Sequence, residues 1–329
     1  MKYSLLIVTD HSTHTDTNSV YRLARAMRED PRCKSVWVCS RGLEENKDFF
    51  GGIPDAEIFV SPVNDVFEFD PDGAAFRRDV QLIQRDAVDA ILIRMPQPAD
   101  ASFLFSLEDI VPSSRIINSP AGIMETATKA FLLDVAHLCP DPVMCHSVDE
   151  AKQMSQEMEI VLKPLFSYGG RGIVRLSNTY CWNENERHPL SALSTFLDDS
   201  HFPMVSTRFL KNVTMGDKRT IVANGKILGS ALRMPAPESW MCNVAQGGHA
   251  EIATADKEEL EMERQLTPML RSKGVVFYGF DTLVDDSGMR VLSEINTLSI
   301  GGLVPLHEMR NENILGKAAG LLWDYLEVG

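Results

Sequence analysis

Short hydrophobic runs alternate with amphipathic segments over the first third of the chain. The run at residues 90–93 is continuously apolar, which is typical of a parallel strand covered on both faces. The whole pattern predicts strands at 2–9, 36–39, 56–60, 90–93 and 116–117 and helices at 19–28 and 80–85. Alternating strands and helices indicate a doubly wound α/β domain over residues 1–118. Its ligands should bind beyond the carboxyl ends of the strands.

The middle of the chain shows a helical pattern followed by two strand patterns. Apolar residues recur at helical spacing between 123 and 138. Strands are expected at 160–162 and 173–176. The polar, turn-rich stretch 182–189 is expected to be a surface loop.

A lysine and three glycines stand between those two strands. Lys163 follows the first strand, where a charge without a partner is costly to bury. Gly169, Gly170 and Gly172 allow a tight turn, and Arg171 adds a second cation. The spacing is not that of a P-loop. One interpretation is a phosphate site made of backbone N–H groups and cations. The other is a plain turn beside a lysine that reaches solvent.

Two β-hairpins are predicted in the last third. Asn224-Gly225 between apolar runs is a strong hairpin signal, and residues 285–288 join a second pair of strands. In the first hairpin, a two-residue turn places Arg219 opposite Ser230. Arg233 then falls on the other face of the sheet, unless a bulge shifts the register.

The second hairpin gathers three oxygen-bearing side chains. If its turn is centred between residues 287 and 288, Asp281 faces Glu294, and Asn296 projects from the same face as Glu294. Two carboxylates about 5 Å apart repel by about 3 kcal/mol at an effective dielectric near 20. A bound Mg²⁺ would remove this penalty, and an all-oxygen ligand set suits it. A slipped register, which would separate the acids, is the alternative.

Composition narrows the class of ligand and partner. A net charge of −14 argues against nucleic acid as the main partner. In so acidic a chain, a local group of cations is evidence for an anionic ligand. Cations beside a set of acids suited to magnesium point to a polyphosphate. No apolar run approaches the roughly 20 residues that span a membrane, and the apolar start is too short for a signal peptide. The six cysteines form no C-x-x-C pair, so we expect reduced thiols in a cytoplasmic protein.

An ordered set of motifs resembles the bacterial glutathione synthetases, a family of ATP-grasp ligases. The matching pieces are Ile93-Arg94, Pro98, Asp100, Asn118-Ser119-Pro120, Lys129-Ala130-Phe131, residues 161–164, Gly169-Gly170, and residues 216–219, 233–235, 243–248, 279–281 and 293–296. They occur in family order along nearly the whole chain. The chain departs from the family where substrate is chosen, at residues 95–97, at His249 and in the run 297–302.

The resemblance implies a fold and an activity. The fold would be ATP-grasp, with the N-terminal α/β domain at 1–118 followed by two α+β subdomains that clasp ATP, at 119–204 and 205–329. The activity would be ATP-dependent joining of a carboxylate to an amine through an acyl phosphate, with γ-glutamylcysteine and glycine as the leading substrates. A ligase for another amino acid or peptide pair is the alternative, as is a nucleotide-binding relative without catalysis.

The resemblance also implies roles for individual residues. The nucleotide would be bound by Lys129, Lys163, Gly169, Gly170, Arg208, Phe209, Leu210 and Asp217. Arg219 and Arg233 would be catalytic. Asp281, Glu294 and Asn296 would hold two Mg²⁺ ions, with Mn²⁺ as a substitute. Substrate contacts would come from Arg94, Asn243, Ser299, Gly301 and Gly302. The partners would be small molecules rather than nucleic acid or membrane, and we expect a homo-oligomer.

Overall fold

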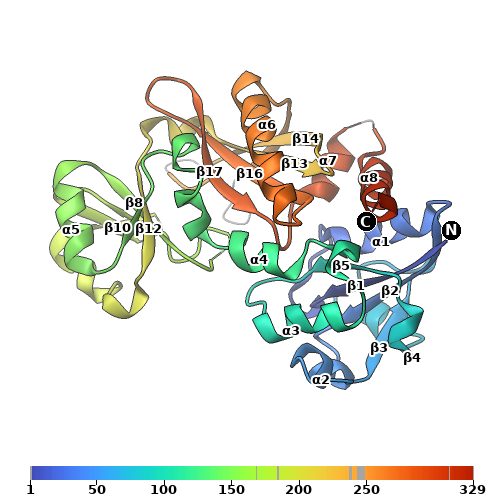
Figure 1. Ribbon diagram of the computed structural model, residues 1–329. Coiled ribbons are helices and arrows are strands. Elements are labelled where there is room, and N and C mark those ends of the chain that lie inside the picture. The colour runs from blue at the N-terminus through green and yellow to red at the C-terminus, as the bar shows by residue number, and fades with distance from the viewer. Residues whose placement is uncertain are drawn as a thin grey trace.

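Three β-sheets follow one another along the chain in the computed structural model (Figure 1). The structure describes residues 2–167, 169–183, 185–236, 239–242, 249–310 and 312–328. Asn243, expected to contact substrate, lies outside the described residues. Within these ranges, no helix is both long and apolar enough to cross a membrane.

The first sheet has six strands in the order β4-β3-β2-β1-β5-β6. Its strands are β1 Tyr3–Thr9, β2 Cys33–Ser40, β3 Ile58–Pro62, β4 Gln81–Ile83, β5 Ala90–Arg94 and β6 Ile116–Ile117. Strands β2, β1, β5 and β6 are parallel, whereas β3 and β4 form an antiparallel edge. The helix predicted at 80–85 is wrong, because β4 pairs with β3 there. Three residues are too few for a periodic pattern to separate a strand from a helix.

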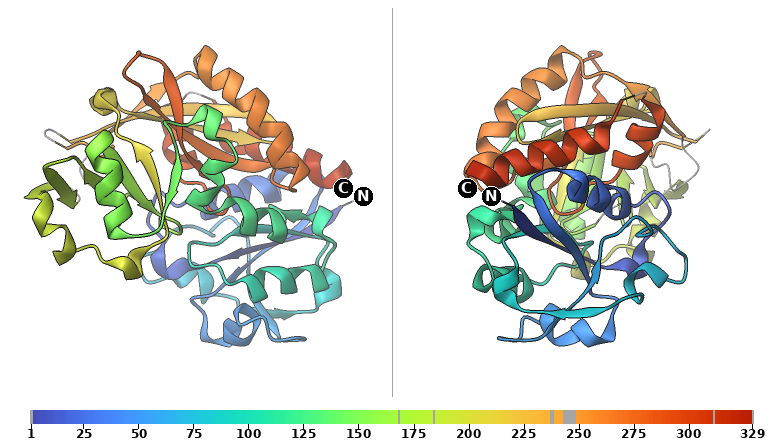
Figure 2. Two further views of the ribbon diagram at one scale, coloured as in Figure 1. Left: turned by 60° about the vertical axis from the view of Figure 1, so that its left-hand side comes forward. Right: turned by 90° about the vertical axis from the view of Figure 1, so that its right-hand side faces the viewer.

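Helices cover both faces of the first sheet. On one face lie α1 Ser19–Glu29 and α8 Ile314–Val328, and the other is covered by α2 Lys47–Phe50, α3 Ala101–Ser106 and α4 Pro120–Thr126. Trp323 of α8 is fully buried and its Nε1 donates to Met27 O at 3.1 Å. The end of the chain therefore packs on its beginning, and the two termini lie side by side (Figure 2).

The second sheet is antiparallel, in the order β11-β10-β9-β8-β12-β7. Its strands are β7 Val143–Cys145, β8 Ile160–Pro164, β9 Val174–Leu176, β10 Tyr180–Asn183, β11 Glu186–Pro189 and β12 Met204–Arg208, with α5 Val148–Glu157 packed on one face. The surface loop expected at 182–189 is wrong, since β10 and β11 pair from Tyr180↔Pro189 to Asn183↔Glu186. The helical pattern at 123–138 is divided between α4 and two 3-10 turns, Lys129–Leu133 and Ala136–Leu138.

The third sheet contains both predicted hairpins, in the order β15-β14-β13-β16-β17. Its strands are β13 Asp217–Ala223, β14 Lys226–Met234, β15 His249–Ala253, β16 Phe277–Val284 and β17 Arg290–Asn296. The helix α6 Lys257–Ser272 packs on one face, while α7 Leu303–Met309 and α8 pack on the other. The third sheet and the first thus share one hydrophobic core through α8.

A single buried asparagine joins the first sheet to the third. Asn118 is 3% exposed, and its Nδ2 donates to the carbonyl oxygens of Phe277 and Thr297, both at 2.6 Å. Its Oδ1 accepts from the N–H groups of Val276 and Phe277, both at 2.9 Å. Four hydrogen bonds satisfy the amide completely. They also fix the start of the run 297–302, which lies beside the candidate site.

Candidate functional site

Two adjoining cavities lie where the three sheets approach one another. The first, of about 370 Å³, is lined by strands β8 and β12 of the second sheet and β13, β14, β16 and β17 of the third. The second, of about 540 Å³, is lined by residues that follow β1 and β5 and by residues of the glycine-rich turn after β8. Glu294, Asn296 and Ser299 line both cavities, so they stand at the junction.

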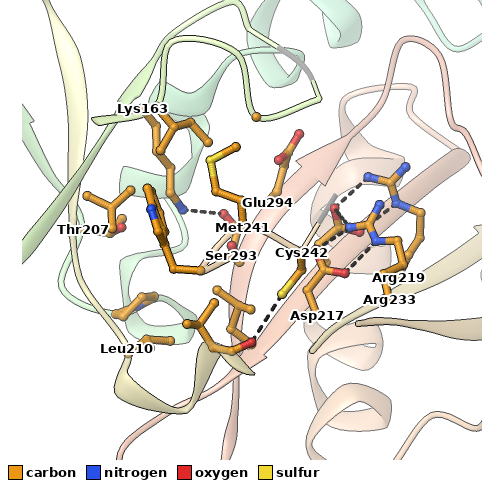
Figure 3. Close-up of a pocket in the computed structure, with 18 of the residues that line it drawn as sticks. Lys163, Thr207, Leu210, Asp217, Arg219, Arg233, Met241, Cys242, Ser293 and Glu294 are labelled. Carbon is orange, nitrogen blue, oxygen red and sulfur yellow. Dashed lines mark hydrogen bonds and ion pairs between the residues drawn. The ribbon is translucent and has the colours of Figure 1, made fainter. Parts of the chain in front are cut away.

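One end of the first cavity is apolar. Its walls include the buried residues Val161, Leu210, Val213 and Met241, together with Phe209. Figure 3 shows Leu210 on the side away from the arginines. A flat apolar ligand, such as a nucleotide base, fits walls of this kind.

The hinge formed by residues 208–210, at the end of β12, uses two of its backbone N–H groups for hydrogen bonds within the protein. The N–H of Arg208 donates to Pro140 O at 3.0 Å, and the N–H of Phe209 donates to Glu159 O at 2.8 Å. Arg208 also lines the cavity, where its Nε donates to Asp141 at 2.9 Å. Neither of these two N–H groups is therefore available to donate to a ligand in the cavity.

Lys163 projects from β8 into the cavity. It is 8% exposed, and its Nζ donates to Ser293 O at 3.0 Å (Figure 3). Burial lowers the pKa of Lys163 to about 8, while the nearby Glu294 opposes that effect. The interpretation of a lysine that reaches solvent is wrong, because the ammonium group is inside the protein.

The glycine-rich turn stands next to this lysine. Gly169, Gly170 and Gly172 have φ values of +66°, +76° and +70°, a left-handed backbone that other residues rarely adopt. Gly169 and Gly170 line the first cavity. A left-handed glycine turn beside a buried cation favours the phosphate interpretation.

A bulge in the first hairpin brings the two candidate catalytic arginines together. The pairing runs Val222↔Ile227 and then Ile221↔Gly229, so Leu228 is an extra residue on β14. A two-residue turn without a bulge would place Arg219 opposite Ser230. With the bulge Arg219 faces Ala231 instead, and Arg233 lies on the same face as Arg219. The sequence signal for this bulge is a glycine inside a strand pattern, at 229.

The two arginines hold two carboxylates in one network. Arg219 binds Asp281 through Nε (2.8 Å) and Nη2 (2.6 Å). Arg233 binds Asp217 through Nε and Nη2, both at 2.6 Å, and its Nη2 also reaches Asp281 at 2.8 Å (Figure 3). Burial would raise the pKa of Asp281, but the two guanidinium groups outweigh it and hold that pKa well below its usual range. Burial raises the pKa of Asp217 to about 6 against the effect of Arg233.

The predicted pairing of Asp281 with Glu294 is confirmed, but its cause differs. The strands meet at Val284↔Arg290, so the turn is centred on residue 287 rather than between 287 and 288. A bulge at Ser293 then shifts the register by one residue and places Glu294 opposite Asp281. Without that bulge the two acids would lie on opposite faces.

The expected repulsion between these acids is relieved by protein cations. The Nζ of Lys129 donates to Glu294 Oε1 at 2.8 Å and to Ser167 O at 3.0 Å, while Asp281 has its two arginines. With its amide oriented to suit both neighbours, Asn296 donates to Glu294 Oε1 and accepts from Arg219 Nη2, each at 3.1 Å. The three candidate metal ligands therefore face one cavity, each with a partner from the chain.

The candidate substrate residues divide into two groups. Ser299 lines both cavities and Gly301 lines the first, while Gly302 has φ +94° and packs against the side chain of Arg219. Arg94, expected to bind substrate, lies outside both cavities and is 3% exposed. Its Nη2 donates to Ser19 Oγ and to Ile300 O, both at 2.7 Å. Arg94 thus supports the run 297–302 from behind.

Several lining residues carry no motif in the sequence. Trp240, Met241 and Cys242 line the first cavity next to the hinge. Burial raises the pKa of the Cys242 thiol to about 12, so it is not a nucleophile at neutral pH. Ser293 contributes its backbone carbonyl, which no side-chain pattern can reveal.

Comparisons of the sequence with known proteins identify one family of relatives. The profile of the prokaryotic glutathione synthetase ATP-grasp domain matches residues 128–311. The glutathione synthetase of Mesorhizobium japonicum is 30% identical over 244 residues, which cover 73% of this chain and 73% of the relative.

Solved structures show a similar fold at low sequence identity. D-cycloserine synthetase DcsG has a TM-score of 0.64 at 12% identity, covering 98% of this chain and 99% of its own. ATP-grasp ligase PsnB, complexed with precursor peptide PsnA2 and AMPPNP, has a TM-score of 0.58 at 13% identity, covering 98% of both chains. At such identities the likeness carries the fold alone, and that fold is ATP-grasp.

Proposed function

Because the chain belongs to the prokaryotic glutathione synthetase family, we propose that it joins γ-glutamylcysteine to glycine and so forms glutathione. It is an ATP-dependent, ADP-forming ligase of the ATP-grasp fold. One observation supports the proposal most: two β-bulges turn Arg219, Arg233, Asp281 and Glu294 toward a single cavity that has an apolar end.

In the proposed complex the nucleotide follows the polarity of the first cavity. The adenine base lies at the apolar end against Phe209 and Leu210. The phosphates lie at the charged end, where Lys163 and the left-handed glycine turn supply an ammonium group and backbone donors. Lys129, at the border of the second cavity, adds a further cation.

The metal ligands fit a hard divalent cation. Asp281, Glu294 and Asn296 present carboxylate and amide oxygens on one face of β16 and β17, as the register of the hairpin requires. We assign two Mg²⁺ ions to them, with Mn²⁺ as a substitute. Mg²⁺ bound there would neutralise charge on the phosphates.

The proposed reaction has two steps, and the chain mainly positions groups for them. A carboxylate oxygen of γ-glutamylcysteine, held in the second cavity, attacks the γ-phosphorus of ATP, and ADP leaves. The glycine amine then attacks the acyl carbon, and phosphate leaves as the amide forms. Arg219 and Arg233 stabilise the negative charge that develops in both steps. The glycine-rich turn keeps water from the acyl phosphate.

The test is glycine-dependent turnover. The protein is incubated with ATP, Mg²⁺ and γ-glutamylcysteine, with and without glycine, and both ADP and glutathione are measured. We expect ADP release that requires glycine and matches glutathione in amount. Turnover with a different acid–amine pair only would refute the glutathione assignment and leave the ligase chemistry standing. The chain departs from the family at residues 95–97 and 297–302, and residues 95–97 and 297–299 line the second cavity, so other acid–amine pairs are assayed in parallel.

Two further expectations stay predictions. A cytoplasmic location follows from the sequence reasoning alone. A homo-oligomer is checked by size-exclusion chromatography with light scattering, where a mass near 36.7 kDa would mean a monomer.

A further inference from the structure

An arginine outside the first cavity is stacked against one of its walls. Arg175 stands on β9, and its guanidinium carbon is 3.6 Å from the centroid of the Phe209 ring. On β10, directly opposite in the ladder, the Trp182 ring lies 4.2 Å from the same carbon. The guanidinium group is therefore in contact with two aromatic rings, of which only Phe209 lines the cavity.

The same arginine is tied to the backbone of the hinge. Glu159 accepts from Arg175 Nε at 2.8 Å and from Nη2 at 2.7 Å. The backbone carbonyl of Glu159 accepts the N–H of Phe209 at 2.8 Å. Glu159 therefore holds both the guanidinium group of Arg175 and the backbone of Phe209. The guanidinium group in turn holds the Phe209 ring.

We propose that Arg175 is a positioning residue for the nucleotide base, acting through Phe209. A phenylalanine at the end of a strand can rotate about its side-chain bonds, and a rotated ring would leave the base without a wall. A planar cation stacked on the ring and anchored by a carboxylate holds that wall in place before the base arrives. The inference rests on the proposed nucleotide site and adds a residue that the motifs did not identify.

The chain offers a control with the same kind of contact in the next hairpin of the same sheet, β10–β11. Arg187 of β11 stacks on the Tyr180 ring with its guanidinium carbon 3.5 Å from the centroid. Neither residue lines the first or the second cavity. Arg187→Met therefore removes the same kind of contact from the same sheet without touching the base wall.

The experiment measures binding of two probes by calorimetry. AMPPNP carries a base, whereas inorganic tripolyphosphate has the phosphates without one. We expect Arg175→Met to weaken AMPPNP binding about tenfold and to leave tripolyphosphate binding unchanged. Arg175→Lys keeps the charge but loses the planar stack, so an intermediate loss is expected. In turnover, KM for ATP should rise while kcat at saturating ATP stays near the wild-type value.

Each outcome separates a positioning role from a structural one. Unchanged AMPPNP affinity in Arg175→Met would overturn the proposal. Equal weakening of both probes would also overturn it, because damage to the sheet as a whole does not distinguish the base from the phosphates. A similar loss of AMPPNP affinity in Arg187→Met would also overturn the proposal. If the wild-type protein fails to bind AMPPNP at all, the proposed function itself is wrong, and this inference falls with it.

Discussion

Replacing Lys163 with methionine should change stability and nucleotide binding in opposite directions. Burial lowers the pKa of this lysine from its ordinary value of 10.5 to about 8. At 1.36 kcal/mol for each pH unit of difference, the buried ammonium group costs the folded state about 3 kcal/mol at neutral pH. Methionine has a similar length and no charge. The variant loses the hydrogen bond to Ser293 O. This loss offsets about 1–3 kcal/mol of the stability gained by removing the buried charge.

The pH dependence isolates the contribution of the charge. Because the pKa of Lys163 is lower in the folded state, the unfolded chain binds more protons between pH 8 and pH 10.5, and stability rises with pH over that interval. The stabilisation is complete above pH 10.5 and is lost as the pH falls through 8. The wild-type protein should therefore gain about 3 kcal/mol relative to Lys163→Met between these limits. Other titrating groups cancel because both proteins carry them.

Urea unfolding of both proteins at pH 7.5, 9 and 10.5 measures this difference, and calorimetry with AMPPNP measures binding at pH 7.5. The variant should bind AMPPNP at least tenfold more weakly, since it lacks a cation for the phosphates. Lys226→Met, at an exposed position of β14, is the control and should change neither quantity. A stability difference that stays flat from pH 7.5 to 10.5 would show that the ammonium group is not desolvated, and would refute the reasoning.

Four shorter predictions concern the metal site, the sheet junction and the glycine turn. Glu294→Gln should abolish ADP release and leave the melting temperature near wild type, whereas the exposed Glu312→Gln should keep full activity; an active Glu294→Gln would remove the metal assignment. Mn²⁺ should bind at least tenfold more tightly with AMPPNP than alone, because guanidinium groups cover Asp281 in the free protein; equal binding by electron paramagnetic resonance would contradict this. Asn118→Ala should lower stability by at least about 3 kcal/mol in urea unfolding, because it leaves buried backbone groups unpaired. Gly170→Val should weaken AMPPNP binding about tenfold in calorimetry, because a β-branched residue resists φ +76°; wild-type affinity would count against a role for the left-handed turn.

Local sequence patterns were sufficient to predict the structure wherever a few residues restrict the backbone to one conformation. Asn224-Gly225 fixed the first hairpin, because both residues tolerate the positive φ that its turn requires. The continuous apolar run at 90–93 marked β5 as a strand covered on both faces. The glycines after Lys163 indicated a tight turn, and all three adopt a left-handed backbone there. In each case the physical constraint lies within a few consecutive residues.

Features that depend on distant partners could not be predicted in this way. The helix predicted at 80–85 failed because β4 exists only through its pairing with β3. The loop expected at 182–189 is a hairpin that closes the edge of the second sheet. Arg94 stands at the end of a strand, as a ligand-binding residue would, yet it turns toward Ile300 O because the third sheet packs there.

The sequence alone identified the arginines and the acids of the site, and the tertiary structure decided which of them share a face. Side chains in a strand alternate between two faces, so a single extra residue reverses the direction of all that follow. The bulge at Leu228 lies where Leu306 of α7 packs against the backbone of Gly229, and the bulge at Ser293 presents its carbonyl to Lys163 across the cavity. Both contacts join residues far apart in the chain, and so the sequence supplied the arginines and the acids while packing placed them together.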